Sequence, residues 1–259
     1  MRRLLFLCFL TTTAFVAEPT TQSWTVEGTK REALVVAPKD AKENPSPLVF
    51  VFHGHGGTMK HAHRMMPIHT HFPEAICIYP QGLTTPGQIT DPEGKKSGWQ
   101  HSKGDQSDRD FKFFDEMLEW AKKEYKIDAK RIYATGHSNG GSFTYMLWAT
   151  RGETFAAFAP SSAAAIKFQK EFKPKPVMHI MGEKDPLVKS TIQKAAVEGV
   201  KKVNGVEKDG KPWHDVKYAT VYESKSDTPV VTIVHPGDHT YFVDAPKSIA
   251  RFFKEHTGK

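Results

Sequence analysis

A serine flanked by glycines stands near the middle of the chain, in the run Gly136-His137-Ser138-Asn139-Gly140. The pattern G-x-S-x-G is typical of a nucleophilic serine when a strand precedes it and a helix follows it. Residues 131–135 predict that strand, and the small residues of 140–149 predict that helix. Only glycine fits at either end of so tight a turn, and its strained backbone would hold the hydroxyl clear of the sheet. We therefore predict that Ser138 is a nucleophile.

A histidine late in the chain is expected to take the proton of this serine, because a hydroxyl is a poor nucleophile at neutral pH. His235 and His239 both follow the apolar segment 230–234, which predicts a late strand. We assign the base to His239, because it lies on the turn beyond that strand, from which its ring can reach over the serine. His235 continues the strand, where backbone groups are expected to hold it, and His179 and His214 are interpreted as structural.

A carboxylate must fix the tautomer of this imidazole and stabilise its protonated form. The expected chain order is serine, acid, histidine, and both Glu183 and Asp185 follow the strand predicted at 177–181. We choose Asp185, since Gly182 starts its turn and Pro186 ends it, which presents the side chain at the edge of the sheet. The remaining acids between the serine and the histidine are interpreted as solvated or badly placed: Asp209, Asp215, Asp227 and Asp238.

Backbone amides must stabilise the negative charge that attack builds on a carbonyl oxygen. One donor is expected to be the amide of Asn139, at the start of the predicted helix. The other is expected from the glycine-rich run His53–Gly57, directly after the strand predicted at 48–52. Within that run we favour the amide of His55, with Gly56 as the alternative.

Strands and helices alternate along the chain and must bring these residues together. Apolar segments at 48–52, 75–79, 131–135, 177–181 and 230–234 predict strands, and 24–26 with 31–37 predict a hairpin around Gly28. Such alternation predicts an α/β fold with a mostly parallel central sheet and helices on both faces.

Two helices and one long loop complete the predicted organisation. Ser107 with Asp110 predicts a helix start of the capping-box type, and 244–256 predicts an amphipathic final helix. The stretch 83–107 is polar and rich in glycine and proline, which favours a substrate-facing loop or lid.

The composition excludes several classes of protein. The chain has 259 residues, of which 39% are hydrophobic and 11% aromatic, enough for a folded core. The formal net charge of +7 is spread along the sequence without interleaved aromatic residues, so we expect no nucleic-acid partner. We also expect no stable membrane insertion and no internal disulfide, since Cys77 would be the one cysteine left after removal of a leader.

The first residues predict a secretory signal. Arg2 and Arg3 precede a short apolar run, and the small side chains of Ala14 and Ala17 offer cleavage positions. The alternative is a single membrane anchor, which the run is short for. We therefore expect a signal peptide at 1–17, one catalytic domain at 18–259, and a secreted or periplasmic protein that is a monomer.

Histidines are dense between positions 53 and 71, which raises the alternative of a metal site. The members are His53, His55, His61, His63, His69 and His71. No cysteine or nearby carboxylate completes a ligand set, so we predict no metal.

Seven runs spread over nearly the whole chain after residue 17 resemble one known group of proteins. They are 53–57, 79–82, 98–100, 110–114, 131–141, 182–188 and 237–240. Together they resemble the secreted polyhydroxybutyrate depolymerase and feruloyl esterase group of α/β-hydrolases. The resemblance implies the α/β-hydrolase fold, supports Ser138, Asp185 and His239 as a catalytic triad, and implies that Trp99 lines the acyl or alcohol pocket. His137, beside the serine, is the other residue that we expect to contact substrate.

The function expected from these residues is hydrolysis of carboxylic esters through an acyl-enzyme, without a cofactor. The expected substrates are feruloyl or acetyl esters of plant polysaccharide, followed by short hydroxyalkanoate oligomers. Two alternatives stay open: a serine peptidase that uses the same three residues, and a catalytically silent carbohydrate-binding or surface protein.

Overall fold

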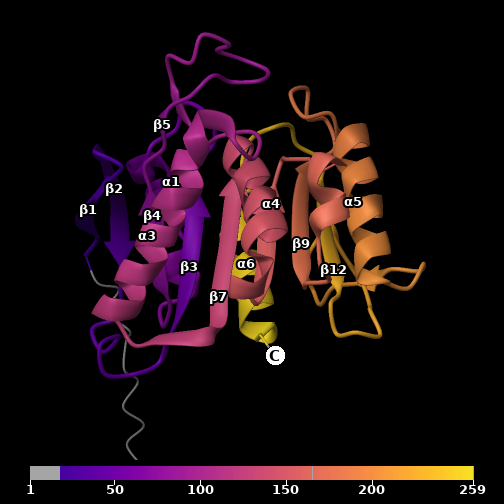
Figure 1. Cartoon of the computed structure of the whole chain (residues 1–259). Helices are drawn as coiled ribbons and strands as arrows, with labels where there is room; N and C mark the ends of the chain where they lie inside the picture. The colour runs from indigo at the N-terminus through magenta and orange to yellow at the C-terminus, as the bar shows by residue number, and fades with distance from the viewer. Residues whose placement is uncertain (1–17, 165, 259) are drawn as a thin grey trace, which may run out of the picture.

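A central sheet of ten strands organises the protein in a computed structural model that describes residues 18–164 and 166–258 (Figure 1). The signal expected at 1–17 lies outside the described residues. The strand order is β1-β2-β4-β3-β7-β8-β9-β12-β11-β10. The strands are β1 (Thr20–Val26), β2 (Thr29–Val36), β3 (Ser46–Phe52), β4 (Ile76–Pro80), β7 (Ile127–His137), β8 (Ala157–Ser161), β9 (Val177–Gly182), β10 (Lys211–Pro212), β11 (Ala219–Tyr222) and β12 (Val230–His235).

The middle of the sheet is parallel and its two edges are antiparallel. Strands β4, β3, β7, β8, β9 and β12 run in the same direction, whereas β1, β2, β11 and β10 run against their neighbours. The central strands are buried along both faces, as the uninterrupted apolar segments predict. Because the carboxyl ends of parallel strands meet at one edge, the turns after β3, β7, β9 and β12 lie close together there.

Helices cover both faces of the sheet. The helices are α1 (Met59–Met65), α2 (Ile68–His71), α3 (Arg109–Glu124), α4 (Asn139–Arg151), α5 (Ser190–Asn204) and α6 (Ala245–Glu255). Helices α3, α4 and α5 pack on one face around Phe50 and Phe52, and α1, α2 and α6 pack on the other around Val49 and Val51. Together with the parallel centre of the sheet, this two-sided packing is the predicted α/β-hydrolase architecture.

The start of α3 differs from the predicted capping box. The helix begins at Arg109, and its N-cap Asp108 makes no side-chain capping bond. Asp110 does not return to cap the helix, because its carboxylate is buried against Arg31 instead. Asp110, which the local spacing predicts as a capping residue, is therefore bonded to Arg31, a residue far away in the sequence.

The long stretch between 83 and 107 is tied to the body of the protein. It contains the short pair β5 (Leu83–Thr84) and β6 (Ser97–Gly98) and a 3-10 turn at Asp105–Asp108. Asp91 accepts hydrogen bonds from the Lys95 and Lys96 amides and contacts His55 Nε2 at 3.0 Å. No helix within 18–164 and 166–258 is long and apolar enough to cross a membrane.

Candidate active site

Ser138 occupies the sharp turn between β7 and α4. Its backbone has φ 55° and ψ −119°, a strained conformation for a residue with a side chain. A Cβ on Gly136 would lie 2.3 Å from the carbonyl oxygen of Gly140, and one on Gly140 would lie 2.3 Å from that of Phe52. Both glycines are therefore required by close backbone approach, as the sequence motif predicts.

A chain of hydrogen bonds joins Ser138 to His239 and Asp185. His239 Nδ1 donates to Asp185 Oδ2 at 2.8 Å, since an ionised carboxylate only accepts. This tautomer leaves His239 Nε2 to accept the hydroxyl proton of Ser138, also at 2.8 Å. The geometry is that of a nucleophile with its base, and of a base with the acid that orients it.

Asp185 is held by four donors. Besides His239, its Oδ2 accepts from Gln193 Nε2 at 3.0 Å, and its Oδ1 accepts from the amides of Leu187 and Val188, both at 2.9 Å. The side chain has no exposed surface. A carboxylate held on both oxygens cannot rotate freely, so it fixes the direction in which it meets the imidazole.

A buried polar chain behind Asp185 was not foreseen from the sequence. Gln193 Oε1 lies 3.1 Å from His179 Nε2, and His179 Nδ1 lies 2.7 Å from the Tyr145 hydroxyl. Because Gln193 donates its amide to Asp185, its oxygen must accept from His179, which in turn accepts from Tyr145. Burial lowers the pKa of His179 to about 4, which keeps this ring neutral.

The turns that carry the acid and the base are bonded to each other. The Glu183 amide donates to the His235 carbonyl at 2.8 Å, and the Lys184 amide donates to the Gly237 carbonyl at 3.0 Å. A Cβ on Gly182 would lie 2.0 Å from the carbonyl oxygen of Asp238, so glycine is needed at this approach. His235 itself accepts from the Gly237 amide and stacks on Phe242, which agrees with a structural role at the strand end.

The two amides expected to stabilise an oxyanion belong to segments close to Ser138. Asn139 is the first residue of α4, where backbone amides have no partner inside the helix. The glycine-rich loop passes close to the serine, since a Cβ on Gly54 would lie 3.5 Å from Ser138 Cβ. The Gly56 amide is engaged with the Ser97 carbonyl at 2.7 Å, which leaves His55 as the better donor of the two alternatives.

Trp99 does not line the cavity beside the serine, contrary to the sequence prediction. The side chain is fully buried, with its ring between Phe52 and Phe143. Its backbone amide donates to Asn139 Oδ1 at 2.7 Å, and its carbonyl accepts from Asn139 Nδ2 at 3.0 Å. Its indole Nε1 donates to the His53 carbonyl at 2.9 Å. Trp99 thus links the residue after the serine to the glycine-rich loop.

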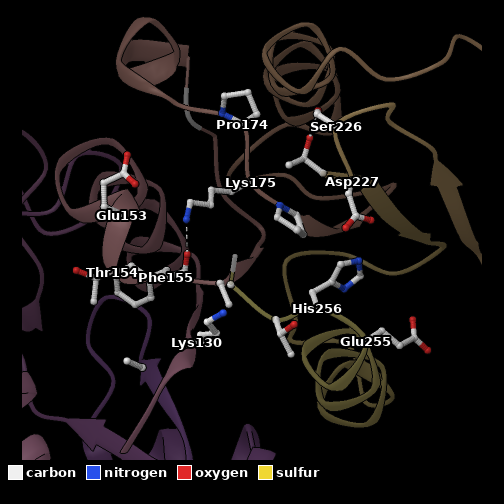
Figure 2. Close-up of a pocket in the computed structure, with 16 residues that line it drawn as sticks. Lys130, Glu153, Thr154, Phe155, Pro174, Lys175, Ser226, Asp227, Glu255 and His256 are labelled. Atoms are coloured by element: carbon white, nitrogen blue, oxygen red, sulfur yellow. Dashed lines mark hydrogen bonds between the residues drawn. The ribbon is translucent and has the colours of Figure 1, made fainter.

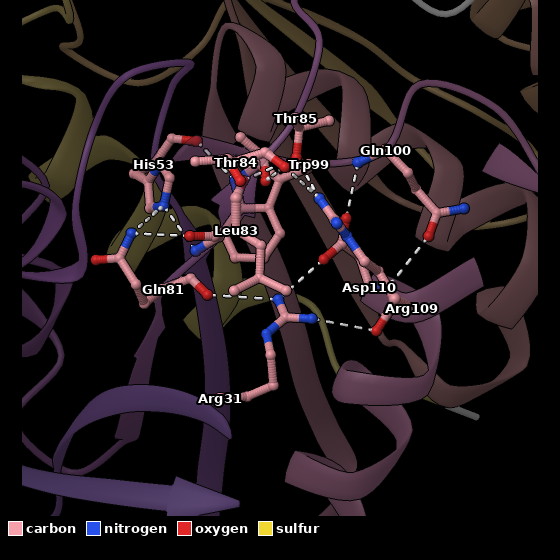
Figure 3. A network of polar contacts seen from close by, with 12 residues as sticks. Arg31, His53, Gln81, Leu83, Thr84, Thr85, Trp99, Gln100, Arg109 and Asp110 are labelled. Atoms are coloured by element: carbon pink, nitrogen blue, oxygen red, sulfur yellow. Dashed lines mark hydrogen bonds and ion pairs between the residues drawn. The ribbon is translucent and has the colours of Figure 1, made fainter. Parts of the chain in front are cut away.

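A buried ion pair lies near Trp99 and is bonded to the residue that follows it in the chain (Figure 3). Arg31 Nη2 and Asp110 Oδ1 are 2.9 Å apart, and their side chains are 1% and 0% exposed. The other oxygen of Asp110 accepts from the Gln100 amide at 2.8 Å, directly after Trp99 in the chain. Figure 3 shows the guanidinium also reaching the backbone of Gln81 and Arg109. Strand β2, the 83–107 stretch and α3 meet in this network.

A cavity of about 570 Å³ opens at the serine. His137 lines it, as expected for a substrate-contacting residue, with its ring 5.1 Å from that of His239. Burial lowers the pKa of His137 to about 3 and that of His53 to about 4. Both rings are therefore neutral at physiological pH.

The histidines of 53–71 do not assemble into a ligand set. His69 Nδ1 pairs with the Tyr79 hydroxyl at 2.7 Å, and His63 stacks on His69. Among the residues that the structure describes, no three histidine, cysteine or acidic side chains are placed to hold a metal ion.

The sheet order, the two helical layers and the strand-turn-helix around Ser138 are those of the α/β-hydrolase class. A sequence model of the phospholipase/carboxylesterase family matches residues 31–228, well over half of the chain. The protein therefore belongs to the phospholipase/carboxylesterase family. The matched segment contains Ser138 and Asp185 and ends before His239.

Two relatives are esterases by name. The chain is 30% identical over 169 residues to a bifunctional acetylxylan esterase/xylanase of Neocallimastix patriciarum, which covers 62% of this chain and 22% of that protein. It is 28% identical over 141 residues to a probable feruloyl esterase C of Aspergillus niger, which covers 52% of this chain and 47% of that protein. These alignments span less than half the length of either relative.

Solved structures share the fold at low identity. An acetyl xylan esterase from Aspergillus awamori superposes with a TM-score of 0.70 at 16% identity, covering 91% of this chain and 99% of that one. A ferulic acid esterase from Anaeromyces mucronatus gives a TM-score of 0.61 at 13% identity, with 95% and 93% covered. At these identities the similarity concerns the fold.

Proposed function

We propose that this protein is a serine carboxylic-ester hydrolase that works through an acyl-enzyme. The observation that carries the proposal is the continuous hydrogen-bonded chain from the Ser138 hydroxyl through His239 to Asp185, with 2.8 Å at each step. The membership of the phospholipase/carboxylesterase family supports the same reaction class.

The proposed reaction has two halves. Ser138 Oγ attacks the ester carbonyl while His239 Nε2 takes its proton, and the amides of His55 and Asn139 stabilise the oxyanion. His239 then gives the proton to the departing alcohol, which leaves the acyl group on Ser138. In the second half His239 takes a proton from a water molecule as the water oxygen attacks the acyl carbonyl. His239 then returns this proton to Ser138 Oγ as the bond between Oγ and the acyl carbon breaks, which releases the carboxylic acid. Asp185 stabilises the imidazolium in both halves.

The proposed substrates are feruloyl or acetyl esters of plant polysaccharide, with short hydroxyalkanoate oligomers next. The names of the two relatives support the first group. We propose a secreted or periplasmic monomer that needs no cofactor, with a signal peptide at 1–17.

A panel of esters run on matched variants tests this function. The wild type is expected to hydrolyse 4-nitrophenyl acetate and methyl ferulate, and Ser138→Ala is expected to lose this activity while remaining folded. Ser142→Ala, one turn along α4, is the matched control and is expected to retain activity. Turnover of an aminoacyl-anilide alone would favour a peptidase, and failure of a fluorophosphonate probe to label Ser138 would favour a silent binding protein.

A further inference from the structure

Basic side chains line the wall of the active-site cavity that α1 forms. Lys60, His61 and Arg64 are exposed and line the same cavity as Ser138. Lys60 and Arg64 are one helical turn apart, whereas Met59 and Ala62 turn their side chains into the core. No aspartate or glutamate belongs to the lining of this cavity. One wall of the cavity therefore carries positive charge that the other walls do not offset.

These two cations have no acidic partner among the described residues. Arg64 Nη2 lies 3.5 Å from His61 Nδ1, and neither Lys60 nor Arg64 forms an ion pair with a described acid. Elsewhere on the surface many lysines do pair with an acid, among them Lys112 with Glu27, Lys122 with Glu119, Lys173 with Glu153 and Lys201 with Glu198. The charges of Lys60 and Arg64 are therefore available to a ligand in this cavity.

Two acids that contact residues of the site have other partners. Asp185 is occupied by His239, Gln193 and two backbone amides. Asp91 is occupied by His55 and by the amides of Lys95 and Lys96. Neither carboxylate is therefore free to neutralise Lys60 or Arg64.

A second cavity in the same molecule is lined by side chains of both charges (Figure 2). It measures about 480 Å³ and lies among residues that precede β8, β9 and β12, at the amino edge of the parallel strands. Its lining mixes Lys130 and Lys175 with Glu153, Asp227 and Glu255, and Lys175 donates to the Phe155 carbonyl. Of these two cavities, the one at Ser138 is lined by cationic side chains without acidic ones.

We propose that the active site selects esters that carry a carboxylate away from the bond to be cleaved. With the scissile carbonyl at Ser138, the carboxylate would extend along the cavity to α1, where Arg64 offers paired donors and Lys60 a point charge. Uronic-acid residues of a polysaccharide and the free end of a hydroxy-acid oligomer both present such a group. This inference rests on the proposed esterase function and adds a substrate class to it.

Two pairs of matched esters test the inference. Mono-4-nitrophenyl glutarate against 4-nitrophenyl pentanoate places the charge on the acyl side. The comparison of 3-acetoxybutyrate with 3-acetoxybutanamide, its primary amide, places the charge on the alcohol side of the ester. Each is assayed with the wild type, with the double variant Lys60→Gln/Arg64→Gln, and with Lys130→Gln, an exposed lysine of the second cavity, as the control.

The wild type is expected to have a higher kcat/KM for the anionic member of at least one pair. The pair that shows this preference indicates on which side of the ester bond the carboxylate is recognised. In the double variant the KM of that anionic ester is expected to rise about tenfold, with kcat and the neutral ester changed less than twofold. Lys130→Gln is expected to behave as the wild type, and added salt should erase the preference.

Two results would overturn the inference, and they are distinguishable. Turnover of both neutral esters with no preference for either anion, or equal loss on both members of a pair in the double variant, would refute anion selection and leave the esterase proposal standing. Absence of turnover of all four esters would refute the esterase proposal and this inference with it.

Discussion

Removal of the Asp110 carboxylate is expected to destabilise the protein severely. Asp110→Ala leaves the Arg31 guanidinium, whose side chain is 1% exposed, without the oxygen 2.9 Å away that balances its charge. Burial lowers the pKa of Arg31, which reflects the cost of keeping this charge out of water. The Gln100 amide also loses its acceptor. Breaking a buried ion pair from one side costs about 3–5 kcal/mol of unfolding free energy.

The same helix supplies the matched control. Asp115 pairs with Arg151 through two hydrogen bonds of 2.9 and 2.8 Å, but the two side chains are 45% and 34% exposed. Solvent screens such a pair, so Asp115→Ala is expected to cost about 0–1 kcal/mol. The comparison separates burial from hydrogen-bond count, because both acids lie on α3 and both face an arginine.

Urea unfolding at pH 7, followed by fluorescence and circular dichroism, measures both variants. We expect a midpoint for Asp110→Ala far below that of the wild type and a midpoint for Asp115→Ala close to it. Equal midpoints for the two variants would refute the reasoning that the buried network around Arg31 stabilises the fold more than an exposed pair does.

Three further predictions concern the site and its surroundings. Trp99→Phe keeps an aromatic ring and removes the N–H that donates to the His53 carbonyl. The kcat for 4-nitrophenyl acetate is expected to fall about tenfold, with KM little changed. An unchanged kcat would show that Trp99 does not help to position the oxyanion amides. Gln193→Leu removes the amide that donates to Asp185 Oδ2. Both kcat and the pH–rate profile are expected to change. A change in thermal stability alone would assign Gln193 a purely structural role. Burial lowers the pKa of His179 to about 4, so between about pH 4 and 6.5 the unfolded chain binds a proton there that the native state does not. As the pH falls from about 6.5 to 4, this ring alone is expected to lower the unfolding free energy by up to about 1.4 kcal/mol per pH unit, and the buried rings of His53 and His137 add to that slope. Urea midpoints that stay level over this range would contradict the neutral buried rings.

Much of the fold could be predicted from the sequence, because buried parallel strands leave a strong local pattern. The apolar segments at 48–52, 75–79 and 177–181 became β3, β4 and β9 with bounds shifted by at most two residues. Strand β8 was missed, because Ala157–Ser161 has a single large apolar residue, Phe158, among small residues and a proline, and this gives no strand-like pattern. Its neighbours β7 and β9 make it a strand.

Helix α5 was missed as well. Its sequence is rich in lysine and its amphipathic pattern is carried by small side chains such as Ala196 and Val197.

The candidate site divides along the same physical line. Ser138, Asp185 and His239 could be proposed because turns after strands have local sequence signals, and the structure joins the three side chains by hydrogen bonds. Trp99 was misplaced, since the resemblance that assigned it to the pocket does not show which groups surround its ring in this chain. Gln193 was not found at all, because no local pattern reveals a helix residue that bonds an acid eight positions earlier.

The backbone bonds between the turn at 183–185 and the turn at 235–237 have a consequence for how the enzyme can vary. They hold the turn of Asp185 and the turn of His239 in a fixed relative position, although α5, β10 and β11 lie between the two turns in the chain. Gln193 at the start of α5 bonds Asp185, but exposed side chains in the rest of that segment can change without breaking the bonds between the two turns. A displacement of either turn, by contrast, carries its partner along, so the imidazole is aligned before any ester arrives.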